Sequence, residues 1–354
     1  MNELNRRKFL GAASGAAAAA ALTEPSSAAT APAKYTVEDQ QPFRAQTRRL
    51  KLSANGRYFA ALLFPTDYPT NFRLKPEIYP VCTPGGVPVT GTHEYCFIHH
   101  QSVMCGHGKV KIGDRKKPYD LYRKLNFPEP NRPDKWHRDY NLFDLGPSGM
   151  QRITDAQWSA TDKITIDLRL DWQTRERNQE TGETLLREQR RYELSQRGRF
   201  TIIDHFTSLT PTAADTATLL TDRHSFCGVR VNDLIDVDDG GTLRDSEGRV
   251  NGSGNYWDAN GDRKTPRWVD CAGKIGSDTA GIALMGHPAN IRNQFYYREW
   301  GLMEVSPCLN TDVPFSTEKP FQFAARYVAH DGLLTARDAN ELFDDFAASK
   351  FPDN

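Results

Sequence analysis

The residues most suited to chemistry lie in one short stretch, residues 93–108. Four of the nine histidines of the chain fall there, and imidazole both titrates near neutral pH and ligates metals. We therefore expect His99, His100 and His107 to take part in proton transfer. If a divalent metal is bound, the expected ligands are His99 and His107, although no spacing here specifies a metal or any other cofactor. Adjacent His99 and His100 can share a pocket only if they lie in a loop, because strand neighbours point to opposite faces.

A second pattern is a strand of alternating charges at residues 186–192. Glu188, Arg190 and Tyr192 share one face of that strand. Such a face can bind sugar hydroxyls, or it can be a solvated face with cross-strand ion pairs. The sequence leaves both readings open.

These motifs resemble, in order, those of the bacterial PmoA-like family, over about residues 74–328. The stretches that carry the resemblance begin with Tyr79-Pro80-Val81, Thr83-Pro84-Gly85-Gly86, His99-His100 and Gly106-His107-Gly108. The chain differs at Gln101, where the family usually has Arg. The family label refers to methane oxygenase, an integral membrane enzyme, whereas this chain has no apolar run of membrane length.

The resemblance implies further site residues. Arg230 ends a strand similar to the family's Gly-hydrophobic-Arg strand, where it could clamp a carboxylate or pair with Asp233 or Glu247. Trp268 and Asp270 match a Trp-x-Asp-x-x-Gly stretch, so Trp268 could stack on a sugar ring and Asp270 could act as acid or base.

Two more pairs follow from the same resemblance. His287 and Asn290 belong to a His-Pro-x-Asn turn, and Glu188 and Arg190 to a Glu-x-Arg strand. We expect His287 to join the catalytic groups, and Glu188, Arg190 and Asn290 to bind substrate. The alternative for the turn is a strand end at which Asn caps the backbone.

The elements that must position these residues are mostly strands. Residues 163–172 alternate strictly, with Ile164, Ile166, Leu168, Leu170 and Trp172 on one face, and residues 185–194 and 200–206 continue as a meander. Further strands are expected at 58–64, 225–231, 281–285 and 321–328. Long polar loops are expected at 114–148 and 236–266.

One helix is expected near the C-terminus. Thr335 and Asp338 fit a capping box, and Ala339, Leu342 and Phe346 fall on one face at helical spacing. The helix should cover one face of a sheet.

The first 33 residues are expected to be a twin-arginine signal peptide. Arg6-Arg7-Lys8 precede an alanine-rich apolar run and small residues, the order found in export signals. The protein is then periplasmic or secreted, and residues 34–354 form a single β domain. Export permits disulfides among the six cysteines, although buried free thiols are equally compatible with the sequence.

Charge excludes one class of partner. The chain has 45 basic and 45 acidic residues, and no basic stripe to neutralise a phosphate backbone, so nucleic acid is not an expected partner. We expect a carbohydrate or another small molecule instead, and no membrane span.

Together these features predict an all-β fold, a large antiparallel β-sandwich with a short C-terminal helix. The family resemblance implies the galactose-mutarotase-like supersandwich type. The favoured function is an exported enzyme acting on carbohydrate, as a glycoside hydrolase, lyase or epimerase. One alternative is a non-catalytic carbohydrate-binding protein with a groove lined by Trp257, Trp268, Tyr296 and Tyr297. The other is a metal-dependent oxidoreductase.

Overall fold

The computed structural model describes residues 33–41, 47–65, 74–92, 99–122, 149–174, 182–251 and 265–352. Residues 33–354 form one compact unit. The expected signal peptide therefore lies almost wholly outside the described residues, as do most of the loop at 114–148 and part of the loop at 236–266.

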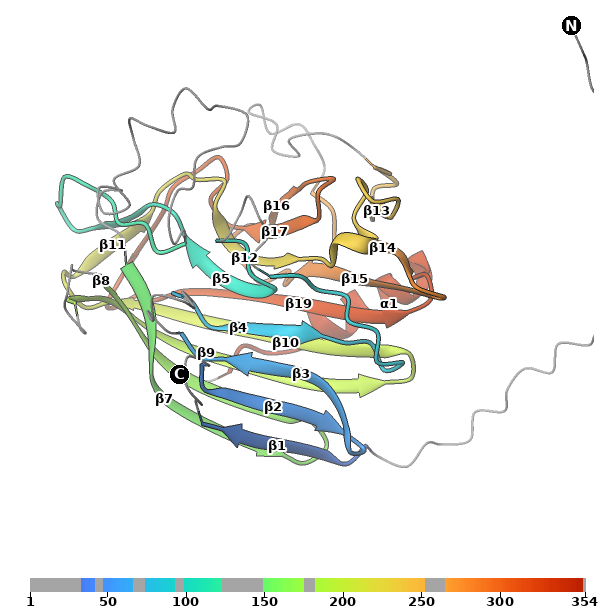
Figure 1. Ribbon diagram of the computed structural model, residues 1–354. Coiled ribbons are helices and arrows are strands. Elements are labelled where there is room, and N and C mark those ends of the chain that lie inside the picture. Colours follow the sequence, from blue (N-terminus) through green and yellow to red (C-terminus); the bar gives the residue numbers. More distant parts are fainter. Residues whose placement is uncertain are drawn as a thin grey trace, which may run out of the picture. The chain divides into compact units, whose positions relative to one another are not determined.

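Two eight-stranded antiparallel sheets make up most of this unit (Figure 1). The first sheet has the order β1 (Tyr35–Gln40), β2 (Arg49–Ala54), β3 (Arg57–Leu63), β4 (Glu77–Val81), β5 (Val103–His107), β12 (Ser225–Arg230), β17 (Leu302–Ser306) and β16 (Gln294–Tyr297).

The second sheet contains the longest strands. Its order is β13 (Thr242–Asp245), β14 (Trp268–Ile275), β15 (Asp278–Gly286), β19 (Phe321–Asp331), β10 (Phe200–Pro211), β9 (Thr184–Arg197), β8 (Ile164–Thr174) and β7 (Gly149–Ala160). A small third sheet joins β18 (Val313–Ser316), β11 (Thr216–Leu219) and β6 (Val110–Ile112).

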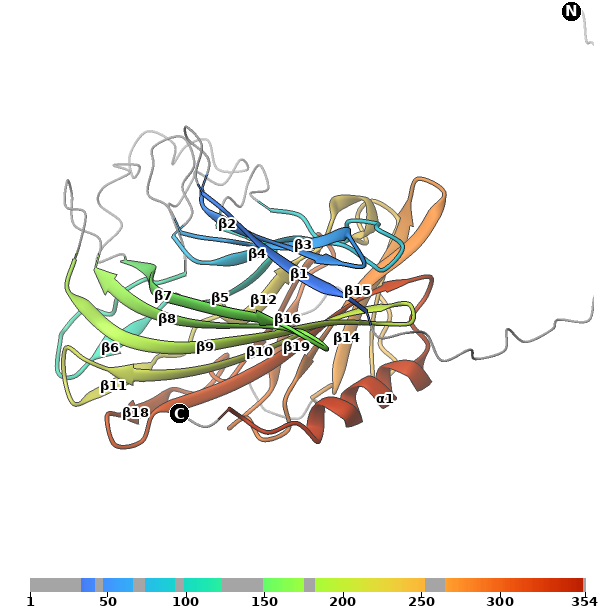
Figure 2. The ribbon, with the colours of Figure 1, turned by 90° about the horizontal axis from the view of Figure 1, so that it is seen from below.

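Alternation along the strands explains why the two sheets face each other. In β8, every second side chain from Ile164 to Trp172 is buried, so this face must pack on another apolar surface. The first sheet supplies that surface, since Trp172 stacks on Phe226 of β12 at 6.4 Å between ring centroids. The main core lies between the two sheets (Figure 2).

The helix α1 (Ala336–Ala347) covers the outer face of the second sheet (Figure 2). Thr335 is its N-cap, and the Thr335 side chain accepts a hydrogen bond from the Asp338 amide. Leu342 and Phe346 are buried against strand residues such as Phe206. The N-cap at Thr335 and the covering role of the helix are confirmed, while the Asp338 carboxylate accepts a hydrogen bond from Arg199.

The predicted fold class is confirmed as well. The described chain is mostly strand, in large antiparallel sheets that form a β-sandwich, with one short helix at its C-terminal end. Within the described residues, none of the helical structure has the length and apolar character that crossing a bilayer requires.

Candidate functional site

The register of the first sheet aligns five side-chain positions across its outer face. Tyr296 lies opposite Glu304, Glu304 opposite Gly228, Gly228 opposite Met104, and Met104 opposite Glu77. These residues come from β16, β17, β12, β5 and β4, so the row joins segments that are far apart in sequence.

Gly228 leaves room in the middle of this row. A Cβ atom added there would lie 2.9 Å from Cγ of Glu304 and 3.3 Å from Cε of Met104. Only glycine at this position lets the Glu304 side chain lie over the centre of the sheet face.

Titratable and aromatic side chains gather around this row. We call this group the outer-face cluster, and it consists of Lys75, His99, His100, Tyr122, His224, Arg230, Trp300 and Glu304. Met104, Tyr122, Tyr296, Leu302 and Leu309 form a small apolar cluster under it, separate from the main core.

Glu304 is the most unusual member of the outer-face cluster. Its side chain is 1% exposed, and the Tyr122 hydroxyl donates a hydrogen bond of 2.5 Å to Oε1. The other oxygen, Oε2, has no hydrogen-bond partner among the described residues. Burial raises the pKa of Glu304 well above its usual value, although Tyr122 and Lys75 oppose that shift. Burial therefore favours the protonated form of Glu304, which can donate a proton.

Three imidazoles lie around Tyr122, the hydrogen-bond partner of this acid. The His99 ring is 4.3 Å from the His100 ring, 6.0 Å from the Tyr122 ring and 5.9 Å from the His224 ring, measured between centroids. His100 stacks on Trp300 at 5.1 Å with an interplanar angle of 9°. Burial, together with the neighbouring His99 and Arg230, holds the pKa of His100 well below its usual value. His100 is thus a neutral ring fixed against an indole, while His99 is only partly buried.

Lys75 closes the floor of the cluster. Its ammonium group donates hydrogen bonds to the main-chain carbonyls of His99 and Tyr122 and lies 4.3 Å from the centroid of the Tyr122 ring. Burial lowers the pKa of Lys75 to about 8, against the opposing effect of Asp120, Glu77 and Glu304. Lys75 therefore fixes both chain segments that bring His99 and Tyr122 to the site.

Arg230 forms one wall. Its guanidinium is 5.2 Å from the centre of the Trp300 ring and donates a 2.8 Å hydrogen bond to Asp233. The sequence left open whether Arg230 binds ligand or pairs with Asp233 or Glu247, and the structure shows the pair with Asp233.

A second layer of titratable groups lies behind the outer-face cluster. Asp222 accepts hydrogen bonds from the His224 amide at 3.0 Å and from its ring at 3.1 Å. Burial alone would raise the pKa of Asp222, but the His224 contacts outweigh it and lower this pKa.

His107 and Cys308 form a buried pair in the same layer. His107 Nε2 bonds the Leu220 carbonyl at 2.8 Å, and Nδ1 is 3.8 Å from the Cys308 sulfur. Although burial opposes both shifts, each partner favours the charged form of the other, so the pKa of His107 is raised and that of Cys308 is lowered. Asp222 adds to the effect on His107.

The structure thus unites part of the predicted site. His99, His100 and Arg230 belong to one cluster, and His107 adjoins it through Asp222 and His224. His99 and His100 both contribute because they lie in a turn and not in a strand.

Glu188 and Arg190 are placed elsewhere, and the predicted sugar-binding wall is not what the structure shows. Their side chains are 0% exposed and make a two-bond ion pair at 2.7 Å inside the sandwich. Trp172 also donates to Glu188, and Arg190 donates to Gln151. Alternation correctly assigned both side chains to one face, but this face points into the core.

Four other predicted residues lie at the second sheet, away from the outer-face cluster. Trp268 donates a hydrogen bond from its indole to Asn340 of α1. Asp270 bonds His330 at 2.8 Å and Arg244 at 3.0 Å.

His287 and Asn290 stabilise the same end of the fold. The His287 ring packs edge-on against Phe346 at 4.9 Å. The Asn290 side chain bonds both the amide and the carbonyl of Ala324, which is the strand-end role that the sequence offered as an alternative. A single hollow containing His100, Asp270 and His287 is therefore not formed.

Several members of the cluster escaped the sequence analysis. Glu304, Tyr122, Lys75 and His224 belong to no short motif, and Glu304 occupies an ordinary polar position in an alternating strand. The only available signal was a single carboxylate between apolar residues in Leu302–Ser306.

The residues best placed to bind a metal differ from those predicted from the sequence. Among the described residues, one group of His, Cys, Asp or Glu side chains has ligand atoms close enough for a metal ion, namely Cys105, His205 and Cys227. His99 and His107 are not part of that group.

A cavity of about 220 Å³ lies on the second sheet. It is lined by polar residues of β7 to β10, including Gln157, Arg169 and Gln189, and by Phe351 near the C-terminus. This cavity is distinct from the outer-face cluster.

Fold and site together define a two-sheet antiparallel β-sandwich with a buried acid–base cluster on one outer face. The profile of a family of unknown function, DUF6807, matches residues 49–344. The chain belongs to this family. None of the curated proteins matches it significantly in sequence.

Solved structures with some similarity are distant. A TPR-domain-containing protein from Parabacteroides distasonis is 8% identical with a TM-score of 0.31, and the match covers 86% of this chain and 49% of that one, so this chain spans about half the length of that protein. A "putative mutarotase" from Salmonella typhimurium is 11% identical with a TM-score of 0.28, covering 83% and 97% of the two chains. The Slr1438 protein from Synechocystis is 12% identical with a TM-score of 0.30, covering 85% and 97%. Similarity at this level supports no statement about the activity of this chain.

Proposed function

We propose that the protein is an enzyme that acts on a carbohydrate by general acid–base catalysis at the outer-face cluster. The observation that carries this proposal is Glu304, a buried acid whose pKa is raised by burial and whose Oε2 has no hydrogen-bond partner among the described residues. A buried polar atom without a partner is costly, and a substrate hydroxyl or glycosidic oxygen at Oε2 would remove that cost.

The roles of the residues follow from their surroundings. Glu304 donates a proton, and Tyr122 orients it through the hydrogen bond to Oε1. His99, partly exposed and next to His100 and His224, accepts a proton. An acid and a base on one face provide the pair that glycoside hydrolysis, elimination and epimerisation each require.

Trp300 and Arg230 supply the binding surface. An indole already stacked on one ring presents an apolar plane of the kind on which sugars pack. Arg230 can exchange its exposed partner Asp233 for a substrate carboxylate, because Asp233 is half exposed while Arg230 is 6% exposed at its side chain. The preferred substrate is therefore an acidic or hydroxyl-rich sugar.

Proton NMR in heavy water tests this proposal whichever of the three reactions the protein catalyses. A panel of neutral glycosides, uronides and free sugars is incubated with the protein. Hydrolysis gives new reducing-end signals, elimination gives vinyl signals, and epimerisation gives loss of a C–H signal by exchange with solvent.

Variants make the test specific. The Glu304→Gln variant should lose the activity, whereas Glu318→Gln, which changes an exposed glutamate, should keep it. Turnover that survives Glu304→Gln would refute the assignment of the acid.

A second candidate, a carbohydrate-binding protein, is favoured by the polar cavity on the second sheet. The aromatic groove expected from the sequence does not support it. Trp268 lies under α1, Tyr297 bonds buried Asp245, and Trp257 lies outside the described residues. Calorimetry with the same sugars separates the two functions, because binding lost in Gln189→Ala but kept in Glu304→Gln, without turnover, would favour the second.

We further propose that the protein acts outside the cytoplasm and shares its function with the PmoA-like proteins that it resembles. The support is the twin-arginine pattern at Arg6 and Arg7 and the order of the motifs. Mass determination of the protein recovered from the periplasm tests the export proposal, and cleavage near residue 33 is the expected result.

A further inference from the structure

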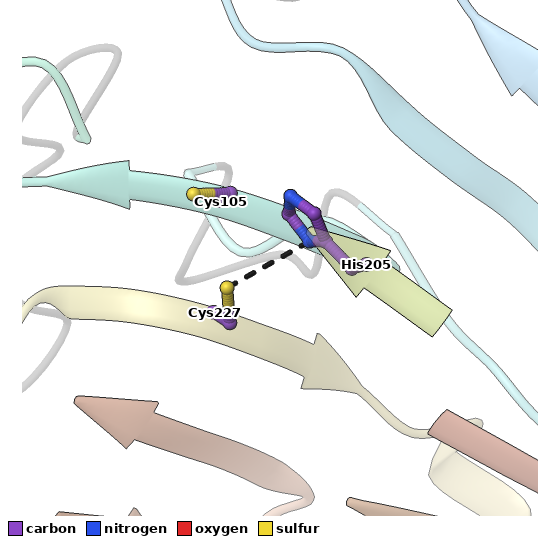
Figure 3. Close-up of side chains that lie close together, drawn as sticks. All are labelled: Cys105, His205 and Cys227. Atoms are coloured by element: carbon purple, nitrogen blue, oxygen red, sulfur yellow. Dashed lines mark hydrogen bonds between the residues drawn. The ribbon is translucent and has the colours of Figure 1, made fainter. Parts of the chain in front are cut away.

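Three metal-binding side chains meet in the interior, far from any role in the proposed acid–base chemistry. Cys105 and Cys227 lie directly opposite each other on β5 and β12 of the first sheet. His205 comes from β10 of the second sheet, and its ring points between the two strands (Figure 3). All three residues are 0% exposed.

The ligand atoms of these residues lie close to the separation that a metal requires. One ligand atom from each lies within 4.8 Å of the others, and the Cys227 sulfur is 3.7 Å from Nδ1 of His205 (Figure 3). Zinc–sulfur bonds of about 2.3 Å and zinc–nitrogen bonds of about 2.0 Å place tetrahedral ligand atoms roughly 3.5–3.8 Å apart. The His205–Cys227 separation is already in that range.

A second observation is that polar groups around this site lack hydrogen-bond partners within the described residues. Nε2 of His205 is buried and has no hydrogen-bond partner within the described residues. The buried Tyr327 adjoins the site, since burial and then Cys227 raise its pKa. Its hydroxyl is a further buried polar group without a hydrogen-bond partner within the described residues.

We propose that Cys105, Cys227 and His205 bind one thiophilic metal ion, zinc(II), which links the two sheets. Two thiolates and a neutral imidazole balance the charge of a divalent ion, so the occupied site is neutral and suits a buried position. Soft sulfur donors favour zinc or copper(I) over magnesium or calcium.

Binding is a proton exchange and needs no oxidant. Each thiol loses its proton as its sulfur binds the metal, so one zinc ion releases two protons to solvent while the imidazole stays neutral. Burial raises the pKa of Cys105 and lowers that of His205. The histidine is therefore ready to bind, and the metal must displace the thiol protons.

The site also constrains when the metal enters. With all three ligands buried between the sheets, the ion must be bound as the chain folds, so metal binding adds to the stability of the folded state. The proposal is independent of the outer-face cluster, and its failure would leave the acid–base proposal untouched.

The experiment is metal analysis of the full chain refolded with zinc and passed through a desalting column. The expected result is about one zinc per chain, with less than a tenth of that in Cys105→Ser, Cys227→Ser and His205→Gln. Cys271→Ser is the matched control, because Cys271 is equally buried and free but outside the group, and it should keep the metal.

A second measurement on the unchanged protein covers the case in which the variants do not fold. Refolding with cobalt(II) should produce thiolate-to-cobalt charge-transfer absorption, which disappears on denaturation in a chelator. Binding of copper(I) in place of zinc would support the site and identify copper as its metal. A folded protein that takes up none of the three ions, or that contains a Cys105–Cys227 disulfide by mass spectrometry, would overturn the proposal.

Discussion

Two outer faces of this sandwich bury titratable groups, and they treat them differently. Under α1, both oxygens of Asp270 are bonded, one to His330 and one to Arg244. Asp204 likewise accepts two hydrogen bonds from Arg326. In the outer-face cluster, Glu304 is equally buried but keeps one oxygen without a partner among the described residues.

This difference in hydrogen bonding distinguishes buried groups that stabilise the fold from buried groups that are available for function. Buried charges that are fully paired belong to the structure, because they repay their desolvation within the protein. A buried acid whose pKa is raised and whose second oxygen has no hydrogen-bond partner among the described residues retains a capacity for proton transfer and for binding. Burial alone therefore does not distinguish structural from functional residues. The hydrogen bonding of each polar atom does.

The largest expected effect is on the rate of the reaction. In Glu304→Gln the amide keeps the shape and can still accept the Tyr122 hydrogen bond, but it has no acidic proton to donate. We expect kcat to fall by about 10²–10⁴-fold, while the free energy of unfolding changes by less than about 1 kcal/mol. Steady-state kinetics measures the change in kcat, and urea unfolding measures the change in stability. A large loss of stability with normal turnover would show that Glu304 is a structural residue.

The second-largest effect is on stability, at the face of the second sheet that α1 covers. Arg326→Leu leaves buried Asp204 without its partner and removes the hydrogen bond to the Leu342 carbonyl. The free energy of unfolding should fall by about 3–5 kcal/mol, with turnover per folded molecule unchanged. The double variant Arg326→Leu/Asp204→Leu should regain much of the loss. Denaturant unfolding of the three proteins tests this, and equal stability of wild type and Arg326→Leu would contradict it.

The third effect concerns pH. Burial lowers the pKa of Lys75 from 10.5 to about 8, so between these values the unfolded chain binds a proton that the folded chain has lost. Stability contributed by this residue therefore rises with pH from about 8 to 10.5 and is absent below 8.

Comparison with Lys75→Met isolates this residue from the buried thiols and tyrosines that titrate nearby. The stability of the wild type relative to the variant should increase by about 3 kcal/mol across that range. Unfolding curves at about pH 7.5 and 10.5 measure it, and a constant difference would show that Lys75 keeps an ordinary pKa.

The smallest effect is at the start of α1. Thr335→Ala removes the acceptor for the Asp338 amide and should cost about 1 kcal/mol. Hydrogen exchange should rise in α1 and in the strands beneath it, but not at Tyr122 or His224. An equal rise in hydrogen exchange on both faces would mean that they unfold as one unit. The two faces would then not differ in their dynamics.

The local chemistry of the chain predicted its elements well. Strict alternation predicted β8 and the meander of β9 and β10 that follows it, because a strand with one buried face must place apolar residues at every second position. The strand β19 was also predicted, although it is buried on both faces. The capping residues and the 3.6-residue spacing predicted α1 for an equally local reason. Clustering of imidazoles predicted His99 and His100, which do lie together.

The rest of the site depended on which faces become covered. Alternation assigns Glu188 and Arg190 to one face of their strand, and it assigns Glu304 to one face of its strand for the same reason. The local sequence does not show whether such a face lies in the core, on a covered outer surface or in solvent. The family resemblance placed Trp268 and His287 in a sugar site, and nothing in their local sequence showed that α1 would cover them.

By itself, then, the sequence determined the strands, the helix and its cap, since each of these depends on neighbours within a few residues. Only the tertiary structure decided that Tyr122, Glu304 and Lys75 surround the histidines, and that Cys105, Cys227 and His205 meet across the core. The physical reason is that pKa values and ligand geometry arise from distances between segments far apart in the chain, as with Tyr122 and Glu304, whose separation is 182 residues. Strand order and sheet packing set those distances.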